Sequence, residues 1–218
     1  MIKNMEMTYI GHSCFYIKGK KTSVVIDPYN PEMTGFKMPK QTAKILLNSH
    51  FHEDHSFNKQ VNFEKLIDTP GEFEIDDVYI TGFPTFHDNK DGEERGKNIA
   101  FQIEMDGISI LHLGDIGHEL PEKYISKIGR VDILLIPVGG HFTIDAFGAS
   151  KIISALEPSI VVPMHFKTTD GSIKELDDLS KFLHEMGVST PEKLDSLKLN
   201  SSESEEKETR IVILNQDH

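Results

Sequence analysis

Three histidines and one aspartate stand within one short segment of this sequence, and all four side chains are of types that bind metal ions. The segment reads Ser49-His50-Phe51-His52-Glu53-Asp54-His55. Imidazole and carboxylate groups suit zinc, iron or manganese. The apolar run 43–48 that precedes it is typical of a buried strand. At such a strand end His50 and His52 can point the same way and share a metal, while Asp54 and His55 project toward a neighbouring position. The alternative is a solvated histidine-rich loop or a purely structural site.

Further potential ligands follow apolar runs elsewhere in the chain, and together the motifs resemble those of a known family. They stand in Val24-Val25-Ile26-Asp27-Pro28, Pro84-Thr85-Phe86-His87-Asp88, Ile110-Leu111-His112-Leu113-Gly114-Asp115 and Val161-Val162-Pro163-Met164-His165. In this order, with the histidine cluster, they resemble the metallo-β-lactamase superfamily along nearly the whole chain. The resemblance implies an α/β protein with the four-layer αββα sandwich of that family.

The resemblance also implies an active metal-dependent hydrolase, because every expected ligand is present. It assigns His50, His52 and His87 to a first metal ion, and Asp54, His55 and His165 to a second, with Asp115 between the two. Asp27 would support the metal loop without touching the metals. Zinc is the favoured ion, with manganese or iron as alternatives. A hydroxide held by the two metals would attack a carbonyl or phosphoryl centre, and Asp54 could accept a proton from the water.

Other motifs point to one branch of the family. They are Gly11-His12-Ser13, Pro70-Gly71-Glu72-Phe73-Glu74-Ile75, Pro137-Val138-Gly139-Gly140 and Phe142-Thr143-Ile144-Asp145. They look like those of the predicted hydrolases related to L-ascorbate-6-phosphate lactonase. The expected substrate is therefore a small ester, lactone or phosphodiester, with an anionic sugar lactone as one option. A phosphodiesterase or nuclease, and a non-catalytic metal-binding protein, are the competing hypotheses.

Several polar residues outside the ligand motifs have two interpretations each. His12 is a substrate contact or a hydrogen-bonded structural residue, and His141 protonates a leaving group or faces solvent. Arg95 and Lys167 could bind a substrate carboxylate or phosphate, although charged loops are usually solvated. His112 lies within an apolar strand, so we expect a buried histidine with both ring nitrogens paired.

Alternating and continuous apolar runs predict the elements that position these residues. The expected strands are 5–10, 13–18, 22–27, 43–48, 63–68, 78–83, 99–105, 108–112, 131–138 and 210–214. Residues 28–42, with three prolines, predict a loop, and helices are expected at 146–156 and 172–186. Segments 88–98 and 200–208 are expected to be mobile surface loops. Two strand-rich halves, each followed by helix, imply packed sheets with helices outside.

Length and charge narrow the classes of function. The 218 residues predict one domain over 1–218, and the formal charge of −12 disfavours nucleic acid as a partner. The absence of a long apolar stretch predicts no membrane span, and the N-terminal segment lacks the features of a signal peptide. The single cysteine, Cys14, is expected to be a buried thiol, which fits a cytoplasmic protein. We expect a small-molecule substrate, and a homo-oligomer is consistent with the resemblance.

Overall fold

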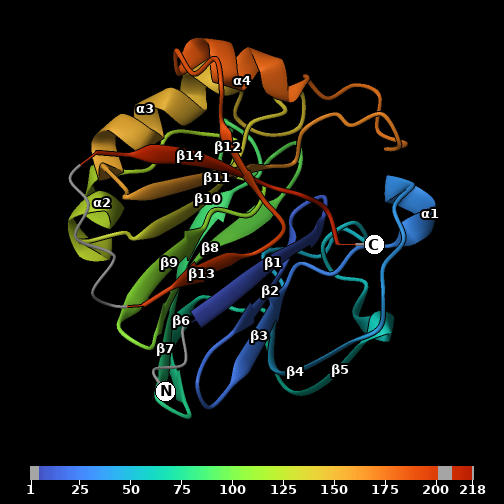
Figure 1. The fold of residues 1–218 in the computed structure, drawn as a ribbon, viewed down its shortest axis with the longest axis vertical. Coiled ribbons are helices and arrows are strands. Elements are labelled where there is room, and N and C mark those ends of the chain that lie inside the picture. The colour runs from blue at the N-terminus through green and yellow to red at the C-terminus, as the bar shows by residue number, and fades with distance from the viewer. Residues whose placement is uncertain (1–4, 201–207, 218) are drawn as a thin grey trace.

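The structure is a computed structural model that describes residues 5–200 and 208–217. Within these ranges the strands form two sheets that pack face to face (Figure 1). The six-stranded sheet has the order β13 (Leu197–Leu199), β1 (Met5–Gly11), β2 (Cys14–Lys18), β3 (Ser23–Ile26), β4 (Gln41–Leu47) and β5 (Val61–Ile67). The strands from β13 to β3 are each antiparallel to the next one in the sheet order, and β3, β4 and β5 are parallel.

The second sheet is also mixed. Among the described residues its eight strands have the order β12 (Glu192–Leu194), β14 (Arg210–Leu214), β11 (Ile160–Met164), β10 (Ile133–Pro137), β9 (Ile108–His112), β8 (Lys97–Met105), β7 (Val78–Phe86) and β6 (Gly71–Ile75). The strands from β12 to β9 are parallel, and those from β9 to β6 are antiparallel. Every residue of β10 is buried, as expected of a central parallel strand covered on both faces.

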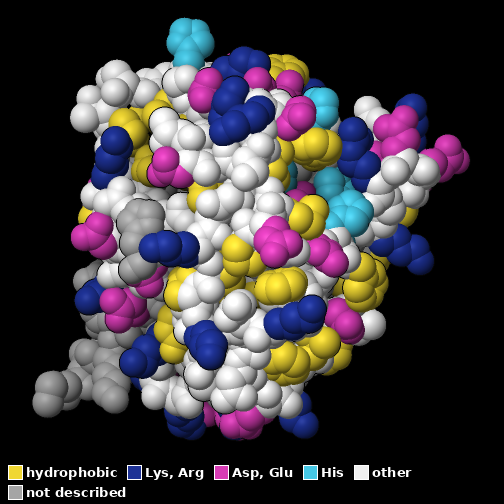
Figure 2. Space-filling view, turned by 90° about the vertical axis from the view of Figure 1, so that its right-hand side faces the viewer, with side chains coloured by type: hydrophobic (Ala, Val, Ile, Leu, Met, Phe, Trp, Pro, Cys, Tyr) yellow, Lys and Arg dark blue, Asp and Glu magenta, His cyan; other side chains and the backbone are white. Residues whose placement is uncertain are grey.

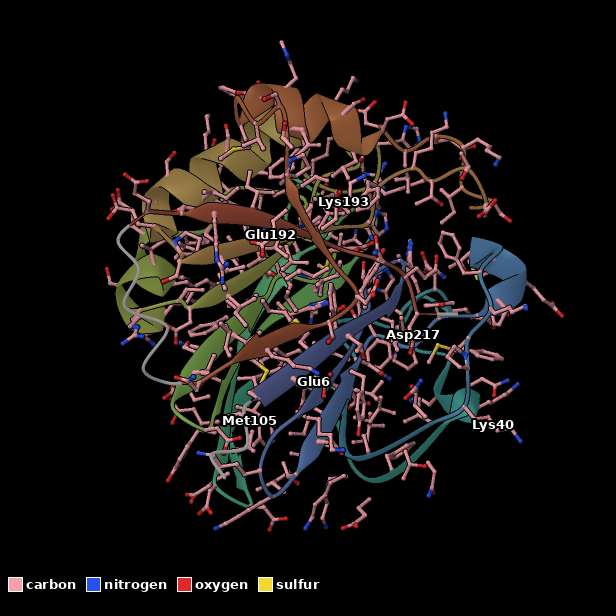
Figure 3. All side chains as sticks on the ribbon, in the orientation of Figure 1. Glu6, Lys40, Met105, Glu192, Lys193 and Asp217 are labelled. Atoms are coloured by element: carbon pink, nitrogen blue, oxygen red, sulfur yellow. The ribbon has the colours of Figure 1, made fainter. Side chains whose placement is uncertain are left out.

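The two sheets share the main hydrophobic core. Met7, Phe15 and Ile45 of the six-stranded sheet meet Ile103 and Leu135 of the eight-stranded sheet. Figure 3 shows the side chains that fill this space, with Glu6 marking β1 in one sheet and Met105 marking β8 in the other. Each fully buried side chain of this size contributes about 1.5–3 kcal/mol, so the core fixes the pairing of the sheets.

Helices and loops cover the outer faces. Helices α2 (Glu122–Ile128), α3 (Ala146–Leu156) and α4 (Leu179–Glu185) pack on the eight-stranded sheet (Figure 1). Short helix α1 (Pro31–Thr34) belongs to the segment whose Tyr29, Phe36 and Met38 pack on the outer face of the six-stranded sheet. A 3₁₀ turn, η1, spans Asn58–Gln60. The expected αββα order is confirmed, with a short outer layer on the side of α1.

Two sequence-based expectations about the elements were wrong. Residues 28–42 contain α1, where Asn30 accepts a hydrogen bond from the Glu32 backbone and Pro31 occupies the first helical turn. The helix expected at 172–186 begins only at Leu179, because the Asp177 amide donates to the Gly139 carbonyl instead of to a helical neighbour. The sequence also missed α2, β6, β12 and β13.

The remaining expectations vary in outcome. Helix α3 and strand β14 have the expected bounds, and the thiol of Cys14 is buried. Of the loop expected to be mobile at 200–208, residues 201–207 lie outside the described residues. No helix in the described parts of the chain combines the length and the apolar character that crossing a membrane requires.

Candidate metal centre

All the predicted metal ligands lie at one edge of the sandwich, where several strands of both sheets end. Asp27 follows β3, the histidine cluster follows β4, His87 follows β7, and His165 follows β11. The carboxyl ends of parallel strands meet at the same edge of a sheet, which explains why motifs far apart in sequence come together. Figure 2 looks onto this edge, and histidine side chains gather there in a hollow beside acidic and apolar side chains.

Two groups of side chains at this edge have the chemistry and spacing of metal ligands, and a third, Asp27 with His50 and His55, overlaps both. Ring nitrogens of His50, His52 and His87 lie within 4.8 Å of one another. Ligand atoms of His12, Asp54, His55 and His165 form a second group within the same limit. The sequence predicted both groups apart from His12.

Asp115 connects the two groups. Its Oδ2 lies 3.2 Å from His55 Nε2, 3.2 Å from His87 Nε2 and 3.0 Å from His165 Nε2. Its side chain is almost fully buried. One carboxylate therefore faces imidazoles of both groups, as the resemblance implies for a ligand between two metals.

A single buried carboxylate orients two of the histidines. Asp27 accepts hydrogen bonds from the Ser49 amide at 2.7 Å, the Ser49 hydroxyl at 2.6 Å and His55 Nδ1 at 2.9 Å. The Ser49 hydroxyl in turn lies 2.9 Å from His50 Nδ1 and accepts its proton, because its own proton points to Asp27. Both rings then carry hydrogen on Nδ1, so Nε2 is the ring atom that each would offer to a metal.

The buried polar atoms fit bound metal ions. His87 Nδ1 donates to the Phe142 carbonyl at 3.1 Å, so Nε2, which faces Asp115, is the ring atom that it would offer to a metal. Among the described residues, His50 Nε2 and Asp115 Oδ1 are buried without a hydrogen-bond partner. Unsatisfied buried polar atoms cost free energy, and a divalent cation satisfies both kinds of atom. The donor set of imidazoles and carboxylates suits zinc, manganese or iron.

Burial and neighbouring charges shift the pKa values of the ligand candidates in different directions. Burial opposes the protonation of His55 and His87, but the Asp115 carboxylate outweighs it and raises the pKa of both, that of His55 well above its ordinary value. Burial opposes the ionisation of Asp115, but His165 and His55 outweigh it and hold its pKa well below the usual range. Burial lowers the pKa of His50 well below its ordinary value, with His55 adding to the effect. Burial and His165 lower the pKa of His12 to about 4. Asp115 is therefore an anion at neutral pH, and His50 and His12 are neutral.

A cavity of about 590 Å³ opens over the two groups. His52, Asp54, His87, Asp115 and His165 contribute to its lining on the side of the metal centre. The rest of the lining consists of Met33, Glu53, Arg95, Phe142 and Ile173. A cavity of this size suits a small molecule.

Of the four residues expected to contact substrate, one lines the cavity and three do not. Arg95 lines the cavity, whereas His12, His141 and Lys167 are not among its lining residues. The His12 side chain is buried, with Nε2 3.3 Å from Asp54 Oδ2. His141 is exposed, and its ring packs edge-on against Phe142, with centroids 4.4 Å apart.

Sequence reasoning missed the residue that shapes the loop after His87. The buried carboxylate of Asp88 accepts backbone hydrogen bonds from Lys90, Gly92, Glu94 and Arg95 at 2.8–3.0 Å. The segment expected to be mobile at 88–98 is thus a hydrogen-bonded turn around one side chain. An aspartate followed by a glycine four residues later is a weak signal of such a turn. His118 Nε2 accepts the Phe86 amide at 3.1 Å.

Comparison with known proteins shows the same family along the chain. Residues 6–165 match the family model described as the beta-lactamase superfamily domain. A UPF0173 metal-dependent hydrolase of Pyrococcus furiosus is 26% identical over 211 residues, which cover 83% of this chain and 93% of that protein. Another, from Thermoplasma volcanium, is 31% identical over 196 residues, covering 77% and 86%.

A solved structure from Thermotoga maritima resembles the whole chain. Its name assigns it to the Zn-dependent hydrolases of the metallo-beta-lactamase superfamily. It is 34% identical and covers 98% of this chain and 100% of its own, with a TM-score of 0.79.

Proposed function

The chain belongs to the beta-lactamase superfamily, as its motifs predict, and is a metal-dependent hydrolase; from this premise we propose that it cleaves a small ester, lactone or phosphodiester at a centre of two divalent metal ions. The position of Asp115 is the observation that supports this most directly. Its Oδ2 lies within 3.2 Å of imidazole nitrogens from both ligand groups. A carboxylate shared in this way is what a two-metal centre requires.

In this proposal each ion takes one of the two groups. His50, His52 and His87 hold one, and Asp54, His55 and His165 hold the other, with Asp115 shared. Zinc is the proposed ion, with manganese or iron as alternatives for the same donors. When bound, such a pair lowers the pKa of a water molecule toward neutrality and withdraws charge from the substrate oxygen.

The chain's own side chains move the proton. Asp54 accepts a proton from the attacking water, and His12 holds the Asp54 carboxylate in place through the contact at 3.3 Å. The water oxygen bonds to the carbonyl carbon or the phosphorus, and the bond to the leaving oxygen breaks. That oxygen takes up the proton from Asp54. A direct role for His141 in this last transfer stays a prediction; its ring packs against Phe142, which lines the cavity.

The competing hypotheses have less support. Among the described residues lining the cavity, Arg95 is the one lysine or arginine, and Figure 2 shows basic side chains interspersed with acidic ones on this face. A nuclease needs a basic surface along a backbone of phosphates. A purely metal-binding protein would have no use for a cavity that opens onto both ligand groups.

We also propose a cytoplasmic location. Its support is the cysteine content, since the single cysteine of the chain, Cys14, is a buried free thiol. Proteins of reducing compartments commonly leave thiols unpaired.

The experiment that tests the function combines metal analysis with hydrolysis assays. Protein purified without added metal should hold close to two ions per chain and hydrolyse members of a panel of esters, lactones and phosphodiesters. Asp115→Asn and His52→Gln should lose metal and activity together. The control is His184→Gln, an exposed histidine on α4. Full metal content and full hydrolysis in Asp115→Asn would refute the assignment.

A further inference from the structure

The cavity walls beyond the metal centre are mainly apolar, with one cation. Met33, Phe142 and Ile173 supply apolar surface, whereas Arg95 and Glu53 supply the charges. Met33 is 44% exposed, so its side chain is open to contact. A sugar would bring several hydroxyl groups to these walls, and each hydroxyl needs a polar partner when water is displaced. The walls therefore suit a substrate with an apolar body better than a polyhydroxylated one.

The guanidinium of Arg95 is placed to receive an anion from the cavity. It lies over the Phe142 ring, 5.8 Å from the centroid, and its side chain is 33% exposed. Its contact with Glu94 is long at 3.6 Å, and the same Glu94 carboxylate lies 2.5 Å from Lys90 Nζ. A guanidinium held over an aromatic ring can direct its N–H donors into a bidentate contact with a carboxylate or phosphate.

The loop that carries Arg95 is fixed relative to the metal centre. The Asp88 carboxylate, adjacent to the metal-ligand candidate His87, accepts the Arg95 amide at 2.8 Å. The His87 amide donates to the Gly96 carbonyl at 3.0 Å, which closes the loop on its other side. The predicted metal ligand His87 and the cation Arg95 therefore stand at the two ends of one short turn. This arrangement sets the separation between the reacting bond and a charged group of the substrate.

We propose that the substrate is an amphipathic anion: a hydrolysable bond at the metal centre, an apolar segment against Phe142, Ile173 and Met33, and a carboxylate or phosphate on Arg95. This inference rests on the proposed function for the position of the reacting bond. It adds a specificity-determining residue, Arg95, and a substrate class narrower than small esters and lactones.

Binding of matched probes tests the anion subsite without catalysis. Calorimetry on the metal-loaded protein compares hexanoate, adipate and 5-phosphonopentanoate, in which one carboxylate can engage the metals and the chain length is nearly constant. The second anionic group should strengthen binding about tenfold or more in the wild type. A larger gain in affinity with adipate indicates that the subsite takes a carboxylate. A larger gain with the phosphonate indicates that it takes a phosphate.

Variants isolate the contribution of Arg95. In Arg95→Gln the gain from the second anion should disappear, and in Arg95→Lys it should be partly kept, because the charge remains and the fork is lost. Lys97→Gln, an exposed lysine two residues further on, is the charge-matched control and should keep the full gain. A gain that survives in Arg95→Gln, or is equally lost in Lys97→Gln, overturns the proposal.

Hydrolysis assays separate this inference from the proposed function. The wild type should cleave mono-p-nitrophenyl adipate with a kcat/KM about tenfold or more above that of p-nitrophenyl hexanoate, and Arg95→Gln should bring the ratio toward one. Equal cleavage of both esters by the wild type would reject the anion subsite and leave the hydrolase standing. An Arg95-dependent gain in binding without hydrolysis of any ester would support the anion subsite and reject the proposed function.

Discussion

His112 Nε2 lies 2.9 Å from the carbonyl oxygen of Ser13, and this contact joins the two sheets directly beneath the metal centre. The other ring nitrogen, Nδ1, accepts the Gly114 amide at 3.0 Å. The imidazole therefore connects the turn that contains His12 with the loop that presents Asp115. Both ring nitrogens are paired and the side chain is fully buried, as the apolar surroundings in the sequence predict.

Replacing His112 should destabilise the fold. His112→Leu preserves most of the volume but leaves the Ser13 carbonyl and the Gly114 amide buried without partners. We expect the free energy of unfolding to fall by about 2–4 kcal/mol at pH 8. Urea denaturation in the presence of a chelator measures this without a contribution from bound metal. His184→Leu, at an exposed position, is the control. Equal stability of wild type and His112→Leu would show that the two hydrogen bonds contribute nothing.

The same residue should make stability depend on pH. Burial lowers the pKa of His112 below its ordinary value of 6.5, so the unfolded chain binds this proton before the folded chain does. The stabilisation is complete above pH 6.5 and is lost as pH falls from there toward the folded pKa, at up to about 1.4 kcal/mol per pH unit. The gap in unfolding free energy between wild type and His112→Leu should therefore narrow from pH 8 to pH 5. A gap that stays constant or widens contradicts the assignment.

Asp27 should control metal affinity without binding metal. In Asp27→Asn the charge that holds His55 and Ser49 is removed while the shape remains, and we expect affinity to fall about 10- to 100-fold. Competition with a chromophoric chelator measures the change. Asp132 is a matched control, because it is also a buried carboxylate that accepts a backbone hydrogen bond, from Ser109 at 2.8 Å. Asp132→Asn should alter stability but not affinity, and equal losses of affinity in both variants would argue for a general effect on folding.

The grouping of the candidate ligands was predictable because it depends on local pattern. A run of apolar residues that ends in histidine or aspartate identifies a strand end, and the resemblance supplied the order of the five motifs. Helix α3 was equally local: Asp145 caps it by accepting the Gly148 amide, and its buried residues Ala149, Ile152, Ile153 and Leu156 lie on one face. Such signals need no knowledge of the tertiary structure.

The cavity walls were not predictable in the same way. Phe142 and Ile173 line it because loops after β10 and before α4 fold over the strand ends, and nothing in their neighbouring residues specifies that. Leu176, Leu179, Phe182 and Leu183 have helical spacing, yet Leu176 is buried in a non-helical segment. There the tertiary bond from Asp177 to Gly139 takes precedence over local preference.

Gly139 should be essential for the position of His165. A β-carbon at Gly139 would overlap the His165 carbonyl oxygen and would also meet the Leu176 side chain at 3.1 Å. The backbone oxygen cannot move aside as a flexible side chain can, so Gly139→Ala should displace the loop that carries this ligand. We expect a loss of about 1–3 kcal/mol in unfolding free energy and at least a tenfold loss of metal affinity.

The matched substitution Gly148→Ala lies in α3, where the nearest contact is 3.1 Å from the Ile144 side chain and alanine favours the helix. Chelator competition on the two variants separates the outcomes. Weakened binding in Gly139→Ala alone supports the close approach of the two strand ends as a constraint on the metal centre, and unchanged binding in both would show that the His165 loop tolerates the shift.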